Sequence, residues 1–301
     1  MINSMSQLSK QHILITGAAG FVGRALTKSL LKNNHQLFLV SRKKGWSVPG
    51  AKVIVGDLND PGFCQRAVRG IDLVYYLAGE KKNLDWHTKQ PFDFMAGNVK
   101  PLLNFLAALK NSKVKTLIYL SSTIVEYIDP QAKVIDGYAL GKYLNEQILK
   151  AFIGQSKIAV KVVRAAAIYG PGDNFDPKTA NFIPAKIRQI AQARSELLVW
   201  GRGLRRMEFI YIDDLVANLI AISRNKSKRF ITVGNKEAVA VNQTVKIISR
   251  LMGKTLLFKH DLNKPDKNTR LHRFTNLIKS KVSLRAGLEQ TIDYYHKKID
   301  V

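Results

Sequence analysis

Short apolar segments alternate with amphipathic segments along the first half of the chain. The short segments are rich in Ile, Leu and Val and predict strands at His12–Thr16, Gln36–Val40, Val53–Val55, Leu73–Leu77, Thr116–Leu120 and Ala159–Arg164. Apolar positions at helical spacing predict helices at Arg24–Asn33, Gly62–Gly70, Phe92–Leu109 and Tyr138–Phe152. Strands that alternate with helices form parallel βαβ units, and short apolar strands belong to a sheet that is covered on both faces. The pattern therefore predicts an α/β fold with a doubly wound parallel sheet.

The alternation loosens after Tyr169, where Gly170-Pro171-Gly172-Asp173 forms a turn cluster. We interpret this cluster as the start of a second, smaller α/β lobe. Beyond it, the pattern predicts strands at Phe209–Ile212 and Phe230–Val233 and helices at Thr244–Met252 and Leu284–Lys298. The predicted division assigns residues 1–170 and 205–235 to the main lobe, and residues 171–204 and 236–301 to the C-terminal lobe.

Charge adds a constraint, because 48 Lys and Arg residues stand against 22 Asp and Glu residues and give a formal net charge of +26. Such an excess indicates an anionic partner, which could be a nucleic acid, a membrane surface or a phosphorylated substrate. The hydrophobic fraction of 46% and the charged fraction of 23% are those of an ordinary globular protein. These fractions exclude intrinsic disorder caused by low hydrophobicity.

Cysteine and histidine offer little metal chemistry. Cys64 is the single cysteine, so the chain forms no internal disulfide and no cysteine-based zinc site, which suits a reducing compartment. The six histidines lack metal-ligand spacing, so we expect them to be structural or exposed and expect no bound metal. Met1–Lys10 lacks the apolar stretch of a signal peptide, and no run approaches the roughly 20 apolar residues that span a bilayer. We expect a soluble, cytoplasmic protein without a membrane partner.

A glycine-rich turn, Gly17-x-x-Gly20-x-x-Gly23, joins the first predicted strand to the first predicted helix. Glycine allows the tight turn and brings backbone N–H groups close to a pyrophosphate, while the helix N-terminus adds a partial positive charge. The pattern predicts a dinucleotide site, with three glycines in an ordinary tight turn as the alternative. The expected cofactor contacts in this turn are Gly17, Ala19, Gly20, Phe21 and Val22.

The end of the second predicted strand is where such proteins distinguish NAD from NADP. An acidic residue there would bind the ribose 2′-hydroxyl of NAD. This chain has Ser41-Arg42-Lys43-Lys44 instead, and a guanidinium suits the 2′-phosphate of NADP. We expect NADP to be the preferred cofactor and NAD the alternative one, with Ser41 and Arg42 as contacts. The competing interpretation is that these are solvated loop charges.

Tyr138 and Lys142 lie at positions i and i+4 of a predicted helix and so share one face. A free phenol has a pKa near 10, but a nearby ammonium and the positive ring of the cofactor stabilise the phenolate. Tyr138 could then exchange a proton with a substrate oxygen while hydride moves to or from the nicotinamide. Ser121-Ser122-Thr123 follows the fifth predicted strand, at the carboxyl edge where open α/β sheets bind ligands, and a serine there would hold the same oxygen.

These motifs, in this order, resemble the extended short-chain dehydrogenase/reductases, the NAD(P)-dependent sugar-nucleotide epimerase/dehydratase group. The resemblance extends from Ile13 to Lys297 and implies a Rossmann-type, NAD(P)-binding main lobe and a substrate-binding C-terminal lobe. The matching motifs are ITGAAGFVG from Ile15, GDL from Gly56, YLAG from Tyr76, SSTIV from Ser121, YALGKYLNE from Tyr138, YGPGD from Tyr169, WGRG from Trp200, EFIYIDDL from Glu208 and AGLEQTI from Ala286.

The resemblance implies a role for each matching residue. Ser122 falls at the catalytic Ser/Thr position, Tyr138 would be the acid/base, and Lys142 would orient the nicotinamide ribose. Glu146 would be structural. The further implied cofactor contacts are Asp57 and Leu58 beside the adenine, Leu77, Ala78 and Gly79 along the ribose and phosphates, and Asn98 beside the active site.

The resemblance also implies a site for a nucleotide diphosphate in the C-terminal lobe. The expected substrate contacts are Ser122, Thr123, Asn181, Arg205, Arg206 and Arg270, with solvated surface charge as the alternative for the arginines. Asn181–Pro184 and Val199–Gly201 resemble the branch that contains GDP-fucose synthase. Three departures change the predicted pocket: Met207 replaces an arginine, Ala167 replaces an asparagine, and Glu126-Tyr127 replaces a Tyr-Gly pair.

The predicted activity is NAD(P)-dependent oxidoreduction or epimerisation of a nucleotide-linked sugar. No glutamate follows Ser122 directly, so a C4 epimerase or a keto-sugar reductase fits better than a dehydratase. The alternatives are a carbonyl reductase for a non-nucleotide substrate, and a cofactor-sensing or nucleic-acid-binding relative with reduced catalysis. The Ser122, Tyr138 and Lys142 set argues against lost chemistry, so we do not expect a nucleic-acid partner. The resemblance alone predicts a homodimer.

Overall fold

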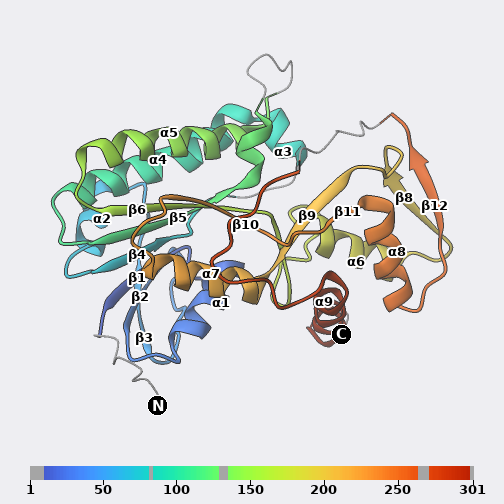
Figure 1. Cartoon of the computed structure of the whole chain (residues 1–301), viewed down its shortest axis with the longest axis horizontal. Coiled ribbons are helices and arrows are strands. Elements are labelled where there is room, and N and C mark those ends of the chain that lie inside the picture. Colours follow the sequence, from blue (N-terminus) through green and yellow to red (C-terminus); the bar gives the residue numbers. More distant parts are fainter. Residues whose placement is uncertain (1–9, 81–83, 129–134, 264–270, 299–301) are drawn as a thin grey trace.

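The largest element of the fold is a parallel sheet of seven strands in the order β10-β6-β5-β4-β1-β2-β3 (Figure 1). The structure is a computed structural model that describes residues 10–80, 84–128, 135–263 and 271–298. This order confirms the predicted doubly wound parallel sheet. The strands are β1 (His12–Thr16), β2 (Gln36–Ser41), β3 (Ala51–Val55), β4 (Leu73–Tyr76), β5 (Thr116–Ser122), β6 (Ala159–Ala165) and β10 (Phe230–Val233).

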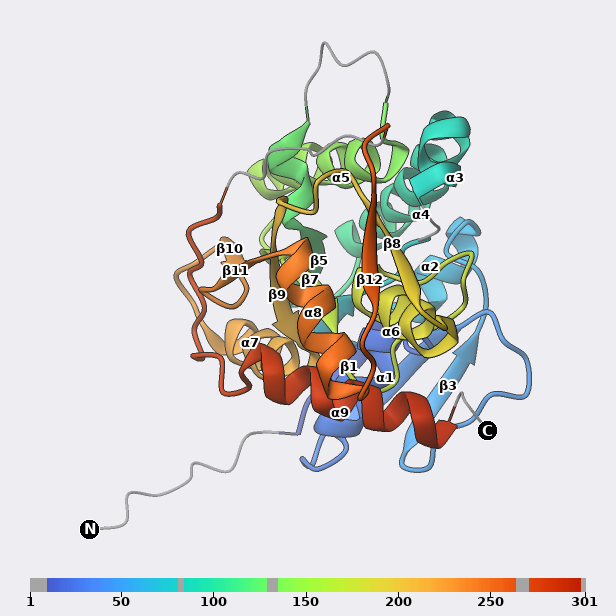
Figure 2. The ribbon, with the colours of Figure 1, turned by 90° about the vertical axis from the view of Figure 1, so that its right-hand side faces the viewer.

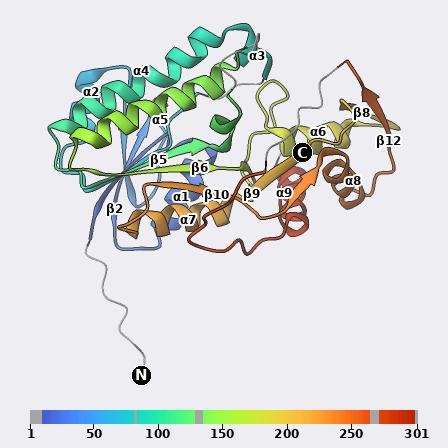
Figure 3. The same cartoon turned by 45° about the horizontal axis from the view of Figure 1, so that its top comes forward.

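Helices cover both faces of this sheet. On one face lie α2 (Pro61–Ala67), α4 (Pro91–Lys110) and α5 (Gly137–Gln155), and on the other lie α1 (Phe21–Leu30) and α7 (Ile212–Arg224) (Figure 3). Side chains along a strand point to alternate faces. Ile13 and Ile15 of β1 therefore pack in the core with α1 and α7, whereas Leu14 packs in the core with α2 and α4. The interiors of β1 and β4 are apolar because both faces of these strands are buried.

The smaller lobe is assembled from the chain segments before α7 and after β10. One sheet has the order β11-β9-β7, and a two-stranded parallel sheet pairs β12 with β8 (Figure 2). The strands are β7 (Ala167–Tyr169), β8 (Glu196–Trp200), β9 (Arg206–Tyr211), β11 (Ala238–Ala240) and β12 (Leu257–Asp261), and the helices are α6 (Phe182–Gln192), α8 (Val241–Leu251) and α9 (Leu284–Lys298). The lobe boundaries predicted above stay a prediction.

The core of the smaller lobe is continuous with the core on the α1/α7 face of the main sheet. Leu26 of α1, Leu219 of α7 and Ile187 of α6 belong to the same buried cluster. The helix α9 closes this cluster through a very close contact, because a Cβ on Gly287 would lie 2.3 Å from the hydroxyl of Tyr169. The two lobes therefore share one packed interior.

Several boundaries differ from the sequence prediction. Helix α1 begins at Phe21 rather than Arg24, because the turn leads into the helix directly at Gly20. Helix α7 was not predicted and includes Ile212, since Tyr211 is both the last residue of β9 and the N-cap of α7. The structure also adds α6, the short helix α3 (Leu84–Lys89) and the 3₁₀ helix η1 (Thr123–Tyr127).

The described residues include neither a membrane-spanning helix nor a metal-binding cluster. No helix there is long and apolar enough to cross a membrane. No group of three or more His, Cys, Asp or Glu side chains there is arranged to hold a metal ion. Cys64 is buried in α2, and burial raises the pKa of its thiol to about 11, which keeps it protonated and unreactive at neutral pH.

Candidate active site

The carboxyl edge of the main sheet collects most of the residues that the sequence singled out. The glycine-rich turn follows β1, Ser41 ends β2, Leu77 and Ala78 follow β4, and Ser122 ends β5. Parallel strands present these ends along one side, and that side faces β9 of the smaller lobe (Figure 1).

The glycine-rich turn fits against the exit of β4 with no room for a side chain. Gly17 has φ +66°, and a Cβ on it would lie 2.9 Å from the nitrogen of Ala78. A Cβ on Gly23 would lie 2.3 Å from the carbonyl oxygen of Gly17. Thr16 fixes the neighbouring strand end, because its Oγ1 accepts from the N–H groups of Leu77 and Ala78 at 3.2 Å each. The turn thus leaves a backbone cradle at the N-terminus of α1, which suits a pyrophosphate.

No carboxylate follows β2. The side chain of Ser41 is buried, and its Oγ accepts from the N–H of Lys43 at 3.0 Å. Arg42 is exposed beside it. Asp57 is also exposed, and its Oδ1 accepts from the N–H of Asn59 at 2.9 Å, while Leu58 is buried. The carboxyl end of β2 therefore presents the exposed guanidinium of Arg42.

Asn98, Gly79 and Lys142 converge although they come from separate parts of the chain. A Cβ on Gly79 would lie 3.2 Å from Oδ1 of Asn98 and 3.8 Å from Nζ of Lys142. Asn98 is buried in α4, and its Oδ1 accepts from the N–H of Glu80 at 2.9 Å. Lys142 is buried in α5 and donates to the carbonyl oxygen of Leu120 at 2.8 Å. The strand ends of β4 and β5 are in this way held beside the ammonium.

Tyr138 lies in the first turn of α5. Asp136 caps this helix, with Oδ1 accepting from the N–H groups of Tyr138 at 2.9 Å and Ala139 at 3.1 Å. Burial raises the pKa of Tyr138 to about 12, the charge of Asp136 acts in the same direction, and a hydrogen bond with Ser122 acts against both. Nζ of Lys142 lies 6.0 Å from the centre of the tyrosine ring. The structure thus joins Ser122, Tyr138 and Lys142 in one group.

His87 packs against the tyrosine, a contact that the sequence did not reveal. Its ring stacks on the ring of Tyr138 with centroids 5.4 Å apart and lies 4.4 Å from the ring of Phe94. Its Nδ1 is 3.6 Å from Oδ1 of Asp136. Sequence spacing identified His87 only as a histidine without metal spacing, because the fold alone brings α3 and α5 together.

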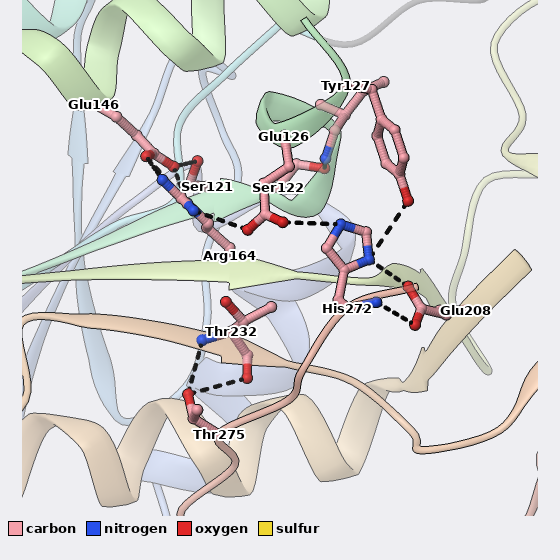
Figure 4. A network of polar contacts seen from close by, with 11 residues as sticks. Ser121, Ser122, Glu126, Tyr127, Glu146, Arg164, Glu208, Thr232, His272 and Thr275 are labelled. Carbon is pink, nitrogen blue, oxygen red and sulfur yellow. Dashed lines mark hydrogen bonds and ion pairs between the residues drawn. The ribbon is translucent and has the colours of Figure 1, made fainter. Parts of the chain in front are cut away.

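A buried ion pair supports the strand that carries Ser122 (Figure 4). Oε1 of Glu146 accepts from the hydroxyl of Ser121 at 2.6 Å, and Oε2 accepts from Nη2 of Arg164 at 2.6 Å. Glu146 is fully buried and Arg164 comes from the next strand, β6. The predicted structural role of Glu146 is therefore what the contacts show.

The expected substrate residues are only partly brought together. Thr123 is buried in η1 beside Ser122, and Asn181 is the N-cap of α6. Arg205 is exposed, whereas Nη2 of Arg206 donates to the carbonyl oxygen of Ala238 at 2.6 Å. Arg270 lies outside the described residues. The departures Ala167 and Met207 both lie in the β11-β9-β7 sheet.

The chain matches a protein family over most of its length. The model of the NAD dependent epimerase/dehydratase family matches residues 13–234. A GDP-L-fucose synthase of Azorhizobium caulinodans is 28% identical, with the alignment covering 94% of this chain and 96% of that protein.

Solved structures share the fold over nearly the whole chain. A UDP-glucose 4-epimerase of Thermotoga maritima with UDP-glucose has a TM-score of 0.83 and 22% identity, covering 96% of this chain and 99% of its own. A UDP-glucuronic acid 4-epimerase of Bacillus cereus, in complex with UDP-glucuronic acid and NAD, has a TM-score of 0.80 and 22% identity, covering 95% and 99%.

Proposed function

Because the chain belongs to the NAD dependent epimerase/dehydratase family, we propose that it is an NAD(P)-dependent oxidoreductase or epimerase of a nucleotide-linked sugar. The family assignment confirms the resemblance seen in the sequence. One observation carries the proposal: Ser122, Tyr138 and Lys142 come together at the carboxyl edge, beside a glycine turn that is shaped for a pyrophosphate. The GDP-L-fucose synthase and the two 4-epimerases support a nucleotide sugar as the substrate class.

The residues that would hold the cofactor are those already placed along the edge. The turn Gly17–Gly23 would hold the pyrophosphate, Arg42 the 2′-phosphate of NADP, and Lys142 the nicotinamide ribose. Bound NAD(P) would supply the hydride acceptor or donor, and the positive charge of its oxidised ring would favour the phenolate of Tyr138. The glycine cradle and the buried ammonium are the features of this chain that fit such a group.

Tyr138 acts on the substrate oxygen as acid or base. With the pKa of its hydroxyl at about 12 in the chain alone, it is protonated at neutral pH and suited to donate a proton to a carbonyl oxygen. To accept a proton it needs positive charge nearby, and Lys142 is placed to supply part of that charge. Ser122, which is hydrogen-bonded to Tyr138, would form a hydrogen bond to the same substrate oxygen.

Epimerase and reductase chemistry would use this group differently. A C4 epimerase returns the hydride to the other face of the sugar, whereas a reductase consumes NADPH stoichiometrically. The protein should be incubated with UDP- and GDP-linked sugars, with and without NADPH, and its products identified. Tyr138→Phe should lower turnover by about 100-fold or more, because it removes the acid/base while keeping the ring. If no nucleotide sugar is bound or converted, the proposal is wrong.

We further propose that NADP is the preferred cofactor. Arg42→Ala should weaken NADPH binding and leave NADH binding unchanged, as measured by cofactor fluorescence. Lys52→Ala is a matched control, since Lys52 is also exposed but lies on β3. Equal affinity of the unaltered protein for NADPH and NADH would contradict the preference. The homodimer also stays a prediction.

A further inference from the structure

A series of polar contacts leads from β5 and β6 to the smaller lobe (Figure 4). Arg164 binds Glu146 on one side, and its Nη1 donates to Oε1 of Glu126 at 2.9 Å on the other. The second oxygen of Glu126 lies 3.5 Å from Nε2 of His272. Nδ1 of His272 contacts Oε2 of Glu208 on β9. His272 therefore bridges a carboxylate of the main lobe and a carboxylate of β9.

The bridge is shielded from water. The side chain of His272 is 2% exposed and that of Glu208 is 6% exposed. Tyr127 also faces the ring, with its hydroxyl 3.5 Å from Nδ1. The ring of His272 therefore lies between two carboxylates, the buried one of Glu208 and the partly exposed one of Glu126, and contacts both.

His272 is anchored in place by its own segment. Its backbone N–H donates to Oε1 of Glu208 at 2.9 Å. Three residues later, the N–H of Thr275 donates to the carbonyl oxygen of Thr232 on β10 at 2.8 Å, and Thr275 Oγ1 accepts from the N–H of Thr232 at 3.1 Å. The imidazole is thus fixed relative to both β9 and β10. It can therefore restrain the side chains of Glu126 and Tyr127, which it contacts.

The restrained element begins at the catalytic serine. Ser122 is the N-cap of η1, where its Oγ accepts from the N–H of Ile124 at 3.3 Å, and the same side chain bonds Tyr138. Glu126 and Tyr127 end η1 and meet His272 there. A single 3₁₀ turn has little stability of its own. Contacts at its far end therefore determine how the serine hydroxyl is held at its near end.

We propose that His272 is a positioning residue: by bridging Glu126 and Glu208 it holds η1, and through η1 it directs the hydroxyl of Ser122 toward the substrate oxygen. This inference rests on the proposed function, because Ser122 is where its effect is expressed. It also gives a role to the Glu126-Tyr127 departure from the family pattern, since these two side chains are the ones that His272 contacts.

The decisive experiment combines His272→Gln with Ser122→Ala. In the otherwise unaltered enzyme, His272→Gln should lower kcat roughly ten- to hundred-fold, the cost of misplacing a reacting group by about 1 Å, while cofactor affinity stays unchanged. In the Ser122→Ala background the same change should cost little more, because the hydroxyl that it positions is gone. Equal losses in both backgrounds would overturn the proposal.

A matched control is His12→Gln at the start of β1, on the opposite edge of the sheet, where Nδ1 of His12 contacts the carbonyl oxygen of Gly70 at 2.8 Å. It should leave kcat unchanged. If His272→Gln does not fold, Glu126→Gln removes the same contact from a side chain that is 30% exposed. The epistasis with Ser122→Ala is expected to be the same.

A second readout is independent of turnover. Amide hydrogen exchange at residues 124–127 should be faster in His272→Gln and Glu126→Gln than in the unaltered chain, and unchanged in His12→Gln. Unchanged exchange in the first two variants would overturn the bridge itself. Faster exchange in a protein that converts no nucleotide sugar would instead keep the bridge and refute the proposed function.

Discussion

At the scale of single residues, the site depends on positions that accept no added atom. A Cβ on Gly17 would meet the backbone that follows β4, and a Cβ on Gly23 would meet the backbone of the glycine turn itself. A Cβ on Gly79 would meet the side chains of Asn98 and Lys142. Backbone cannot move aside as a flexible side chain can. The turn around Gly23 is therefore the least tolerant part of the cofactor cradle.

Gly23→Ala should destabilise the fold by about 1–3 kcal/mol and weaken cofactor binding, because its Cβ would lie 2.3 Å from the oxygen of Gly17. Gly154 is a matched control in α5, since a Cβ there meets nothing within 4 Å. Gly154→Ala should leave cofactor binding intact and stabilise by up to about 1 kcal/mol. Urea denaturation and a cofactor titration measure both. An unaffected Gly23→Ala protein would show that the turn can adjust.

A site residue could be predicted from the sequence only where local geometry positions it. Gly17, Tyr138 and Lys142 are placed by local geometry, a turn or one helix face, so their spacing in the sequence reveals them. His87 and His272 act through partners from distant segments, at Tyr138 and at Glu126 with Glu208. No local spacing encodes those meetings, so the sequence offered six equivalent histidines.

At the scale of elements, β5, β6 and α5 are joined by one buried carboxylate. Glu146 of α5 binds Ser121 of β5 and Arg164 of β6, so a helix and two strands share a single ionic centre. The alternating strands and helices of this region were predictable because each has its own apolar period. Helix α7 was not, because it starts where β9 ends and no loop marks the change of period.

Glu146→Gln should cost about 3–5 kcal/mol of folding free energy, because it leaves the guanidinium of Arg164 without its main buried counter-ion. The exposed pair Arg285–Glu289 in α9 provides the comparison, with side chains 70% and 47% exposed. Glu289→Gln should change stability by less than about 0.5 kcal/mol. Thermal and urea denaturation of both variants measure the difference. Similar losses in the two variants would contradict the buried ionic centre.

At the scale of the whole molecule, the net charge of +26 exceeds what the site uses. Arg42 and Lys142 have proposed roles toward the cofactor, and Arg164 pairs with the buried carboxylate of Glu146. A positive field attracts anionic cofactors and nucleotide sugars alike and adds self-repulsion to the folded chain. The remaining excess has no structural explanation.

Buried tyrosines make the whole fold sensitive to alkali. Burial raises the pKa of Tyr75 and of Tyr138 to about 12, against an ordinary value of 10.0. As pH rises from about 10 to 12, the unfolded chain releases these protons first and so binds fewer than the folded chain, and the free energy of unfolding falls. This stability is fully present below pH 10.

The urea midpoint should therefore decrease steadily above about pH 10. Tyr75→Phe should reduce the steepness of that decrease, because one titrating phenol is removed. A midpoint that stays level up to pH 11 would contradict the prediction.

The pairing of β8 with β12 has a consequence for biosynthesis. Glu196 and Leu257, about sixty residues apart, begin this parallel pair, so β8 has no partner until the ribosome has released β12. The strands β1 to β5 pair with one another, so their partners are available much earlier. During that interval Leu198 and Trp200, which stay more than half exposed even in the finished fold, leave an unpaired apolar edge open to chaperones and to other nascent chains.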